Sequence, residues 1–417
     1  MYEIDETLLQ EARDRIARER KWDVILQLQP PANVSLQGSK ATVNMTRHRF
    51  RFGCNGFLLR RIEDRGLAQA YEEQFAALLN FATLPYYWAS YEPELGKTRY
   101  AEVREMAAWC KEHGIAGKGH PLTYSQTCPA WLNALPDNEV LDLQRKRVHD
   151  LVRDFRGFVD TWDVVNEAFW ADRYDNAVGR WISGARITDA VDELIRLAHE
   201  GNPDAQLLYN DANIRIPEHD ALIKALIERG SPMGAIGLQS HMHVFTWPLR
   251  EAWTICEQYA RFGLPLHFTE LTVLSGRAKD PQDRDWHRVH TDWLTTPEGE
   301  ATQALYGEAF YTLLYSHPAV EAITWWDFSD YHSWQGAPAG LVRADMSPKP
   351  LYERLMALVW GEWATHAEAT IGEAPTMLAH CAAGQHRVEV ALPSGDTLSG
   401  TFTISPQDSG PVTVQLA

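Results

Sequence analysis

The sequence lacks the features that mark several common classes of protein. Only five of its 417 residues are cysteine, and none of them forms a C-x-x-C pair or a regular spacing, which argues against a zinc knuckle and a disulfide framework. No apolar run approaches the roughly 18–20 residues that a membrane-spanning helix requires. Basic residues are outnumbered by acidic ones, 39 against 56, and the net charge is −17. Such a chain has no basic footprint, so we expect neither nucleic acid nor a membrane as its partner.

The N-terminus does not look like a secretion signal. It reads Met1-Tyr-Glu-Ile-Asp-Glu-Thr7, without the basic start and apolar core of a signal peptide. We therefore expect a cytoplasmic protein from the sequence as it stands, and a secreted one if a signal has been removed. The 16 tryptophans fit either aromatic platforms for sugar rings or a tryptophan-rich core.

Short apolar runs recur along the middle of the chain and predict a parallel sheet. There are eight of them, at residues 50–54, 79–84, 115–120, 161–166, 206–210, 235–240, 264–269 and 322–326. Helical patterns such as 187–199 and 219–229 fill the gaps between them. Alternating strands and helices, with eight strands, predict an α/β protein with a (β/α)8 TIM barrel over residues 50–362. A doubly wound open sheet is the alternative, but no G-x-G-x-x-G follows the first strand.

The two ends of the chain have a different pattern. A charged, helix-like segment covers residues 2–20, and strand-like alternation follows at 22–29 and 41–46. Near the other end, alternation recurs at 386–392, 398–404 and 412–416. Two or three strands alone are marginally stable. We therefore predict that segments 1–49 and 363–417 pack together as one small β-rich accessory domain, a sandwich beside the barrel.

Two carboxylates stand at the ends of apolar runs. Glu167 follows the fourth run and Glu270 follows the seventh, and a charge in such a place is costly to desolvate unless it is paired or used in chemistry. In a barrel both would lie at the C-terminal mouth, where barrel enzymes keep their active sites. Two carboxylates are also what a retaining glycosidase needs, one as acid/base and one as nucleophile. Ion pairs at the barrel rim are the structural alternative.

Polar and aromatic residues at neighbouring strand ends allow more than one reading. His241 and His243 form a His-x-His pattern, which would suit a metal-dependent hydrolase, although no third ligand is evident and a hydrogen-bonding role beside Glu270 fits as well. Asn210, Asp211 and Asn213 suit either a site or an ordinary turn. Of the adjacent pair Trp325 and Trp326, one must point away from the site into the core.

Taken together, several segments resemble glycoside hydrolase family 10, the (β/α)8 endo-β-1,4-xylanases. They are Trp162-Asp-Val-Val-Asn-Glu-Ala-Phe169, Tyr209-Asn-Asp-Ala-Asn213, Gly237-Leu-Gln-Ser-His241, Thr269-Glu-Leu271, and Ile323-Thr-Trp-Trp326 with Ser333-Trp334. The resemblance implies that Glu167 is the acid/base and Glu270 the nucleophile, with no metal or other cofactor. It further implies a set of substrate-binding residues: His120, Tyr87, Tyr124, Asn166, Asn210, Gln239, His241, Trp326 and Trp334.

The chain also departs from the family pattern where the sugar is gripped. After the second strand, Glu-Asn and Met-Lys of the pattern are Thr83-Leu84 and Tyr86-Tyr87. After the third, Trp-His is Tyr124-Ser125, and the Asp two residues beyond the nucleophile is Thr272, so His241 is expected to lack a charged partner. We expect a retaining β-glycosidase that acts on β-1,4-xylan or a related polysaccharide. A retaining glycosidase for a decorated glycan and a catalytically weak carbohydrate-binding protein are the alternatives, since hydroxyl-reading groups discriminate steeply.

Overall fold

The computed structural model describes residues 4–184, 187–406 and 410–417, and its larger part is a closed barrel. The barrel strands are β3 (Arg51–Asn55), β4 (Phe81–Pro85), β5 (Ala116–His120), β6 (Val159–Asn166), β7 (Gln206–Asp211), β8 (Ala235–Leu238), β10 (Leu266–Val273) and β11 (Val320–Trp325). They pair in this order, all in parallel, and β11 closes the ring by pairing with both β10 and β3. The predicted fold class is confirmed.

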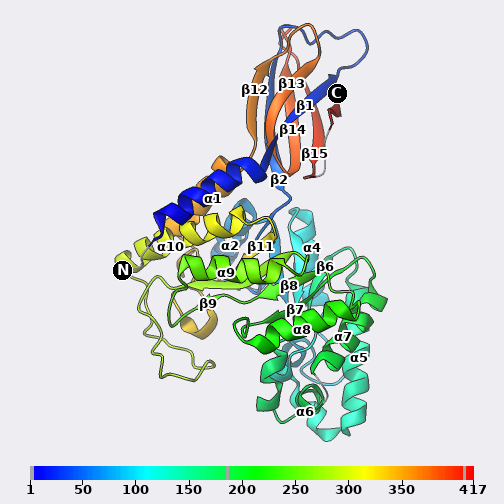
Figure 1. The fold of residues 1–417 in the computed structure, drawn as a ribbon, viewed down its shortest axis with the longest axis vertical. Helices are drawn as coiled ribbons and strands as arrows, with labels where there is room; N and C mark the ends of the chain where they lie inside the picture. Colours follow the sequence, from blue (N-terminus) through cyan, green and yellow to red (C-terminus); the bar gives the residue numbers. More distant parts are fainter. Residues whose placement is uncertain (1–3, 185–186, 407–409) are drawn as a thin grey trace.

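Helices follow each barrel strand and form the outer layer (Figure 1). They are α2 (Arg65–Leu78), α3 (Trp88–Tyr91), α4 (Tyr100–Glu112), α5 (Asp137–Asp154), α6 (Ala177–Gly184), α7 (Ile187–Gly201), α8 (Pro217–Glu228), α9 (Leu249–Ala260), α10 (Pro297–Ser316) and α11 (Pro350–Met356). With helices outside and side chains inside, a barrel strand is buried on both faces, which is why these strands read as continuous apolar runs. In β10 all eight residues are buried. No helix of the described ranges is long and apolar enough to span a membrane.

One predicted strand end is wrong. The run that was expected to stop at Thr269 continues as β10 to Val273, so Glu270 lies inside the strand. The extension exists because a short strand, β9 (His241–Met242), pairs with Thr272 and Val273. This pairing brings His241 beside the strand that carries Glu270.

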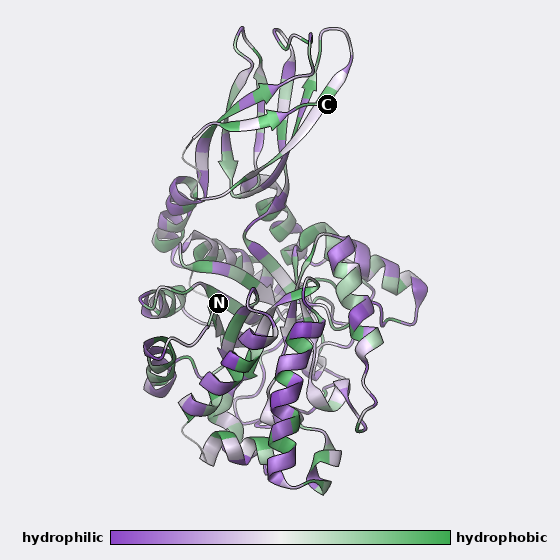
Figure 2. Ribbon diagram, turned by 90° about the vertical axis from the view of Figure 1, so that its right-hand side faces the viewer, coloured by the Kyte–Doolittle hydropathy of each residue, from purple (hydrophilic) through white to green (hydrophobic). Residues whose placement is uncertain are grey.

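The chain ends form two small sheets above the barrel (Figure 1). One contains β1 (Lys21–Gln29), β13 (Thr376–Ala382) and β16 (Val412–Gln415). The other contains β2 (Lys40–His48), β12 (His366–Thr370), β14 (Gly384–Ala391) and β15 (Thr397–Ile404). Buried residues of both sheets make one apolar cluster, among them Leu26, Val43 and Val388. In Figure 2 these strands alternate between hydrophilic and hydrophobic residues, as expected where one face of each strand is covered.

Two details of the terminal segments differ from the expectation. The predicted helix begins at Glu6 as α1 (Glu6–Glu19), while residues 2 and 3 lie outside the described residues. It packs on the barrel helix α10, and its residues Leu8, Leu9, Ala12 and Ile16 belong to the barrel's own apolar cluster. Strands β12 and β13 were also missed.

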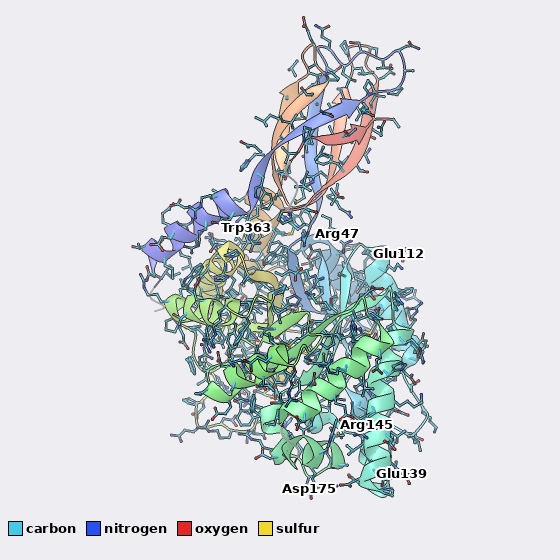
Figure 3. The ribbon with its side chains drawn as sticks, turned by 45° about the vertical axis from the view of Figure 1, so that its right-hand side comes forward. Arg47, Glu112, Glu139, Arg145, Asp175 and Trp363 are labelled. Carbon is cyan, nitrogen blue, oxygen red and sulfur yellow. The ribbon has the colours of Figure 1, made fainter. Side chains whose placement is uncertain are left out.

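The sandwich joins the barrel through an aromatic contact. The ring of Trp363, labelled at this junction in Figure 3, stacks on Tyr315 of α10 with centroids 4.3 Å apart and lies 5.7 Å from Phe52. The guanidinium of Arg20 donates to the carbonyl oxygens of Tyr315, His317 and Val320 at 2.7–3.0 Å. The junction therefore ties the accessory sheets to the end of the barrel opposite the mouth, since Val320 begins β11.

A glycine in β5 makes room for a tryptophan in the layer between the barrel strands and the outer helices. A Cβ built on Gly119 would lie 2.1 Å from the ring of Trp162, whose side chain is fully buried on the neighbouring strand. We predict that Gly119→Ala destabilises the protein by about 1–3 kcal/mol through overpacking, measured by urea unfolding. Gly361→Ala is the control because a Cβ there meets nothing within 4 Å. Equal stability of the two variants would contradict the prediction.

Candidate active site

The two glutamates converge at the C-terminal mouth of the barrel. Glu167 directly follows β6 and holds a left-handed backbone conformation, with φ 53° and ψ 50°, which a non-glycine residue adopts only at an energetic cost. Its amide donates to the carbonyl of Asn210 at 2.9 Å, so the turn is supported from the next strand. Glu270 lies within β10 and is 4% exposed. Both side chains are thus placed by the backbone of the barrel.

Three amides connect the two carboxylates. The Nδ2 of Asn210 donates to Glu270 Oε1 at 2.7 Å and to Asn166 Oδ1 at 2.8 Å. The Nε2 of Gln239 donates to the same Asn166 oxygen at 3.1 Å and to Glu167 Oε1 at 3.0 Å. Each NH2 group uses both of its hydrogens. The three predicted residues therefore lie together and support one oxygen of each glutamate.

His241 supports the second oxygen of Glu270. Its Nε2 lies 2.8 Å from Glu270 Oε2 and its Nδ1 lies 2.9 Å from the hydroxyl of Thr272. A neutral ring with its proton on Nε2 satisfies both contacts, because a threonine hydroxyl can donate to Nδ1. An ionised aspartate at position 272 could accept a hydrogen bond from His241 but could not donate one. Where the family pattern has an aspartate, His241 Nδ1 thus meets the neutral hydroxyl of Thr272, and the carboxylate that His241 contacts is Glu270.

The environments of the two carboxyls push their pKa values in opposite directions. Burial, and then the charge of Glu270, raise the pKa of Glu167 to about 7, against the hydrogen bonds from Gln239 and Tyr124. Burial alone would raise the pKa of Glu270, but the hydrogen bond from His241 and the nearby His120 and Lys118 bring it below its ordinary value. One group is thus suited to carry a proton near neutrality and the other to stay ionised.

A buried ionic network that sequence reasoning missed lies beneath Glu270. Lys118 of β5 and His120 Nδ1 both lie 2.7 Å from Asp163 Oδ2, and His120 Nε2 lies 3.1 Å from the hydroxyl of Tyr87 and 3.9 Å from Glu270 Oε1. Lys118 and Asp163 have no exposed surface. The signal was available in the sequence, because a charged residue interrupts each of these two apolar runs.

The aromatic residues divide between the site and the core. Trp326 faces the rings of His120 and His241 at 5.4 and 5.5 Å, whereas Trp325 is fully buried and donates to the carbonyl of Ala339. Trp334 lies 4.8 Å from His241 and stacks on Trp286, a residue that sequence reasoning missed. Trp286 belongs to the long β10–α10 loop, where no periodic pattern indicated a role.

Two of the tyrosines that differ from the family pattern lie at the mouth of the barrel, and the third lies in its wall. Tyr87 reaches the mouth through His120, and Tyr124 OH lies 2.9 Å from Glu167 Oε2. Tyr86 points the other way, into the wall, with its ring 4.8 Å from that of Trp162. It is buried on this side because alternate residues leaving a strand face opposite directions.

Neither the metal reading nor a full polar cluster after β7 is supported. His243 is buried with its ring 5.1 Å from Trp334 and 6.2 Å from Trp293, and the described residues contain no group of three or more His, Cys, Asp or Glu that could hold a metal ion. Asp211 accepts from the amide of Asn213 at 2.7 Å. Turn chemistry therefore accounts for Asp211 and Asn213, while Asn210 alone joins the site.

The Lys118–Asp163 pair leads to a stability prediction. Burial would raise the pKa of Asp163, but Lys118 and His120 lower it below its ordinary value. We expect Asp163→Asn to lower the free energy of unfolding by roughly 3–5 kcal/mol at pH 7, because it leaves a buried ammonium without its counter-charge. A carboxyl whose pKa is lower in the folded state stabilises the fold fully at pH values above its ordinary pKa, and this contribution is lost as the pH falls toward the lowered value. The deficit should therefore shrink below about pH 4.

The check is chemical denaturation of the variant and the wild type at pH 7 and at pH 3.5. A double variant, Lys118→Met with Asp163→Asn, serves as the matched control, since removing both charges should recover part of the loss. A deficit that is the same at both pH values, or a double variant as unstable as the sum of the single ones, would refute the electrostatic explanation.

Comparison with known proteins agrees with this geometry. Residues 65–358 match the model of glycosyl hydrolase family 10. Endo-1,4-beta-xylanase 1 of Arabidopsis thaliana is 26% identical to this chain, and the match covers 94% of this chain but only 39% of the plant protein. An endo-1,4-beta-xylanase of Geobacillus stearothermophilus is also 26% identical, and that match covers 58% of this chain and 74% of the bacterial protein. The fold matches xylanase 10B of Thermotoga petrophila RKU-1, solved with xylobiose, at a TM-score of 0.63 and 22% identity over 76% of this chain and 95% of that one. The chain belongs to glycosyl hydrolase family 10.

Proposed function

We propose that the protein is a retaining endo-β-1,4-xylanase that hydrolyses xylan or a related β-linked polysaccharide by double displacement. The observation that carries the proposal is the convergence of Glu167 and Glu270 at one barrel mouth, where side-chain amides connect their carboxylates. Their surroundings raise the pKa of Glu167 to about 7 and lower that of Glu270. Retention requires one carboxylic acid and one carboxylate at the same moment. Both are provided here within one network of amides.

In the first step Glu270 attacks the anomeric carbon and Glu167 gives its proton to the leaving oxygen. Asn210 and His241 hold the two oxygens of Glu270, which fixes the direction of attack. Formation of the ester removes the charge of Glu270, and with it a cause that raises the pKa of Glu167. Glu167 is then a stronger acid, so its ionised form can accept a proton from the water that hydrolyses the ester.

The choice of xylan rests on the relatives, which are named as xylanases, and on the aromatic walls of the site. Trp326 and Trp334 flank His241 and present flat apolar surfaces suited to a pyranose ring. A decorated glycan is the second candidate. This candidate is favoured by Tyr87, which stands where the family pattern has a lysine and whose hydroxyl bonds His120. A charged group that would bind a sugar hydroxyl is thus replaced by a neutral one, which changes the selection of the substrate.

Removal of each glutamate should have a different effect. We expect Glu270→Ala to abolish hydrolysis of all β-xylosides, because no ester can form. Glu167→Ala should lose about 10²–10⁴-fold on xylan yet retain turnover of aryl xylosides whose leaving groups need no protonation. Initial rates on xylan, arabinoxylan, mixed-linkage glucan and aryl glycosides measure this, and proton NMR of the first product gives the anomeric configuration.

Glu112→Ala is the control for replacing a glutamate by alanine and should keep full activity, since Glu112 is exposed at the end of α4, outside the site (Figure 3). Full activity of both active-site variants on every glycoside would refute the assignment. A wild-type protein that binds xylan without cleaving any aryl xyloside would favour the carbohydrate-binding alternative.

The proposed roles also define a pH profile. Glu167 must be protonated in the first step, so kcat/KM should decline above about pH 7, the value to which its pKa is raised. On the acidic side activity should persist below pH 4.5, because the pKa of Glu270 lies under that ordinary value. Rates on unactivated xylo-oligosaccharides from pH 3 to 10 measure both limits, because their leaving groups need the proton of Glu167. In Glu167→Ala the decline near pH 7 should disappear; if it persists, another group causes it.

A further inference from the structure

Tyr124 connects the proposed acid/base to a second hydrogen-bond acceptor. Its hydroxyl lies 2.9 Å from Glu167 Oε2 and also bonds the side-chain oxygen of Gln126. The hydroxyl of Tyr174 lies 2.7 Å from that same Gln126 oxygen. Tyr124 lies in the loop after β5, directly before the short helix η1 (Ser125–Thr127). Tyr174 directly follows the short helix η3 (Ala168–Arg173), which begins after Glu167. The row of groups is therefore held by the loops of two neighbouring strands.

The number of protons in this row gives it two stable arrangements. A tyrosine hydroxyl has one proton to donate and can also accept. When Glu167 is ionised, Tyr124 donates its hydrogen bond to Oε2, and the Gln126 oxygen accepts a hydrogen bond from Tyr174 alone. When Glu167 carries a proton, Tyr124 can turn its O–H to the Gln126 oxygen, so that no donor is forced against the protonated carboxyl. Gln126 has two lone pairs and accepts from both tyrosines in that state.

We propose that Tyr124 is a positioning residue for Glu167, which supports the acid/base in both protonation states by turning its hydroxyl between Glu167 Oε2 and Gln126. The proposal rests on the proposed function and extends it. No bond to hydrogen is broken in Tyr124; only the direction of its O–H changes. A residue that serves a group used as an acid in one step and as a base in the next must be able to do this.

The other groups facing Glu167 cannot take this role. Gln239 donates to Oε1 through an amide N–H that has no reversed arrangement. Glu270 of β10 and Asp211 of β7 act on Glu167 only by their charge, and both favour its protonated form. Tyr87, Tyr174 and Tyr209 also lie within electrostatic range, and burial raises the pKa of each, so they stay neutral.

The identity of residue 124 matters for this reason. In the family pattern the corresponding residue is tryptophan, whose indole N–H donates but does not accept. A hydroxyl at this position is a feature of the present chain. The glutamine two residues later supplies the second acceptor that allows this hydroxyl to turn.

The test is the pH dependence of kcat/KM for Tyr124→Phe on an unactivated xylo-oligosaccharide, whose leaving group needs the proton of Glu167. Loss of a hydrogen bond that favours the ionised carboxylate should move the alkaline limit upward by about one pH unit. Turnover limited by hydrolysis of the glycosyl-enzyme should fall at neutral pH, because less Glu167 is then ionised. Tyr174→Phe is the matched control: it removes a donor to the same Gln126 oxygen but does not touch Glu167, so its alkaline limit should stay near that of the wild type.

A uniform loss across the pH range in Tyr124→Phe, with an unmoved alkaline limit, would show that the ring matters only for packing and would overturn the proposal. An equal shift in Tyr174→Phe would overturn it as well. If the wild type cleaves no β-xyloside, the proposed function fails and the pH profile is lost. Titration of ¹³C-labelled glutamate carboxyls by NMR then decides the remaining question, since the pKa of Glu167 should still rise in Tyr124→Phe and an unchanged value would refute the inference.

Discussion

The charge of Glu270, kept inside a buried barrel mouth, is the constraint on which the rest of the site depends. A carboxylate that is 4% exposed would take up a proton unless its surroundings favoured the ion. Here Asn210 and His241 bond its two oxygens, and Lys118 and His120, which both contact Asp163, lower its pKa further. Burial, and then the charge of Glu270, raise the pKa of Glu167, so the ionised state of one glutamate favours the protonated state of the other.

The same constraint explains why the residues around Glu270 come largely from barrel strands. Glu270, Asn210 and Asn166 come from three barrel strands, and Glu167 follows one of them. The left-handed turn at Glu167 is held by the amide bond to Asn210. A rigid scaffold of this kind can hold two carboxyls in different environments a short distance apart, which a loop could do only with a loss of precision. The terminal sandwich packs at the other end of the barrel and leaves the mouth free of its strands.

Much of the fold and the core of the site could be predicted from the sequence, because burial leaves a strong pattern. A strand enclosed on both faces is a continuous apolar run, and a glutamate after such a run is conspicuous. The strands β12 and β13 left a weak pattern, since alanine fills many of their positions (His366-Ala-Glu-Ala-Thr370 for β12). Lys118 and Asp163 were passed over because their pairing across two strands appears only once the register is known. Trp286 lies in a long irregular loop, where neither period nor composition marks contact with Trp334.

The residues that differ from the family pattern act on protonation as much as on sugar recognition. Thr272 presents a hydroxyl to His241 Nδ1, a partner that can donate or accept, whereas an ionised carboxylate can only accept. His241 contacts Glu270 through its other nitrogen, Nε2, so this contact with the carboxylate does not depend on which residue stands at position 272. Tyr124 does the equivalent at the other glutamate, where a hydroxyl stands in place of an indole. The two changes fall on opposite members of the proposed catalytic pair, and both replace a group of fixed hydrogen-bond direction by a hydroxyl that can donate or accept. Both carboxylates thereby keep a polar contact, while the hydrogen-bond direction open to their neighbours changes.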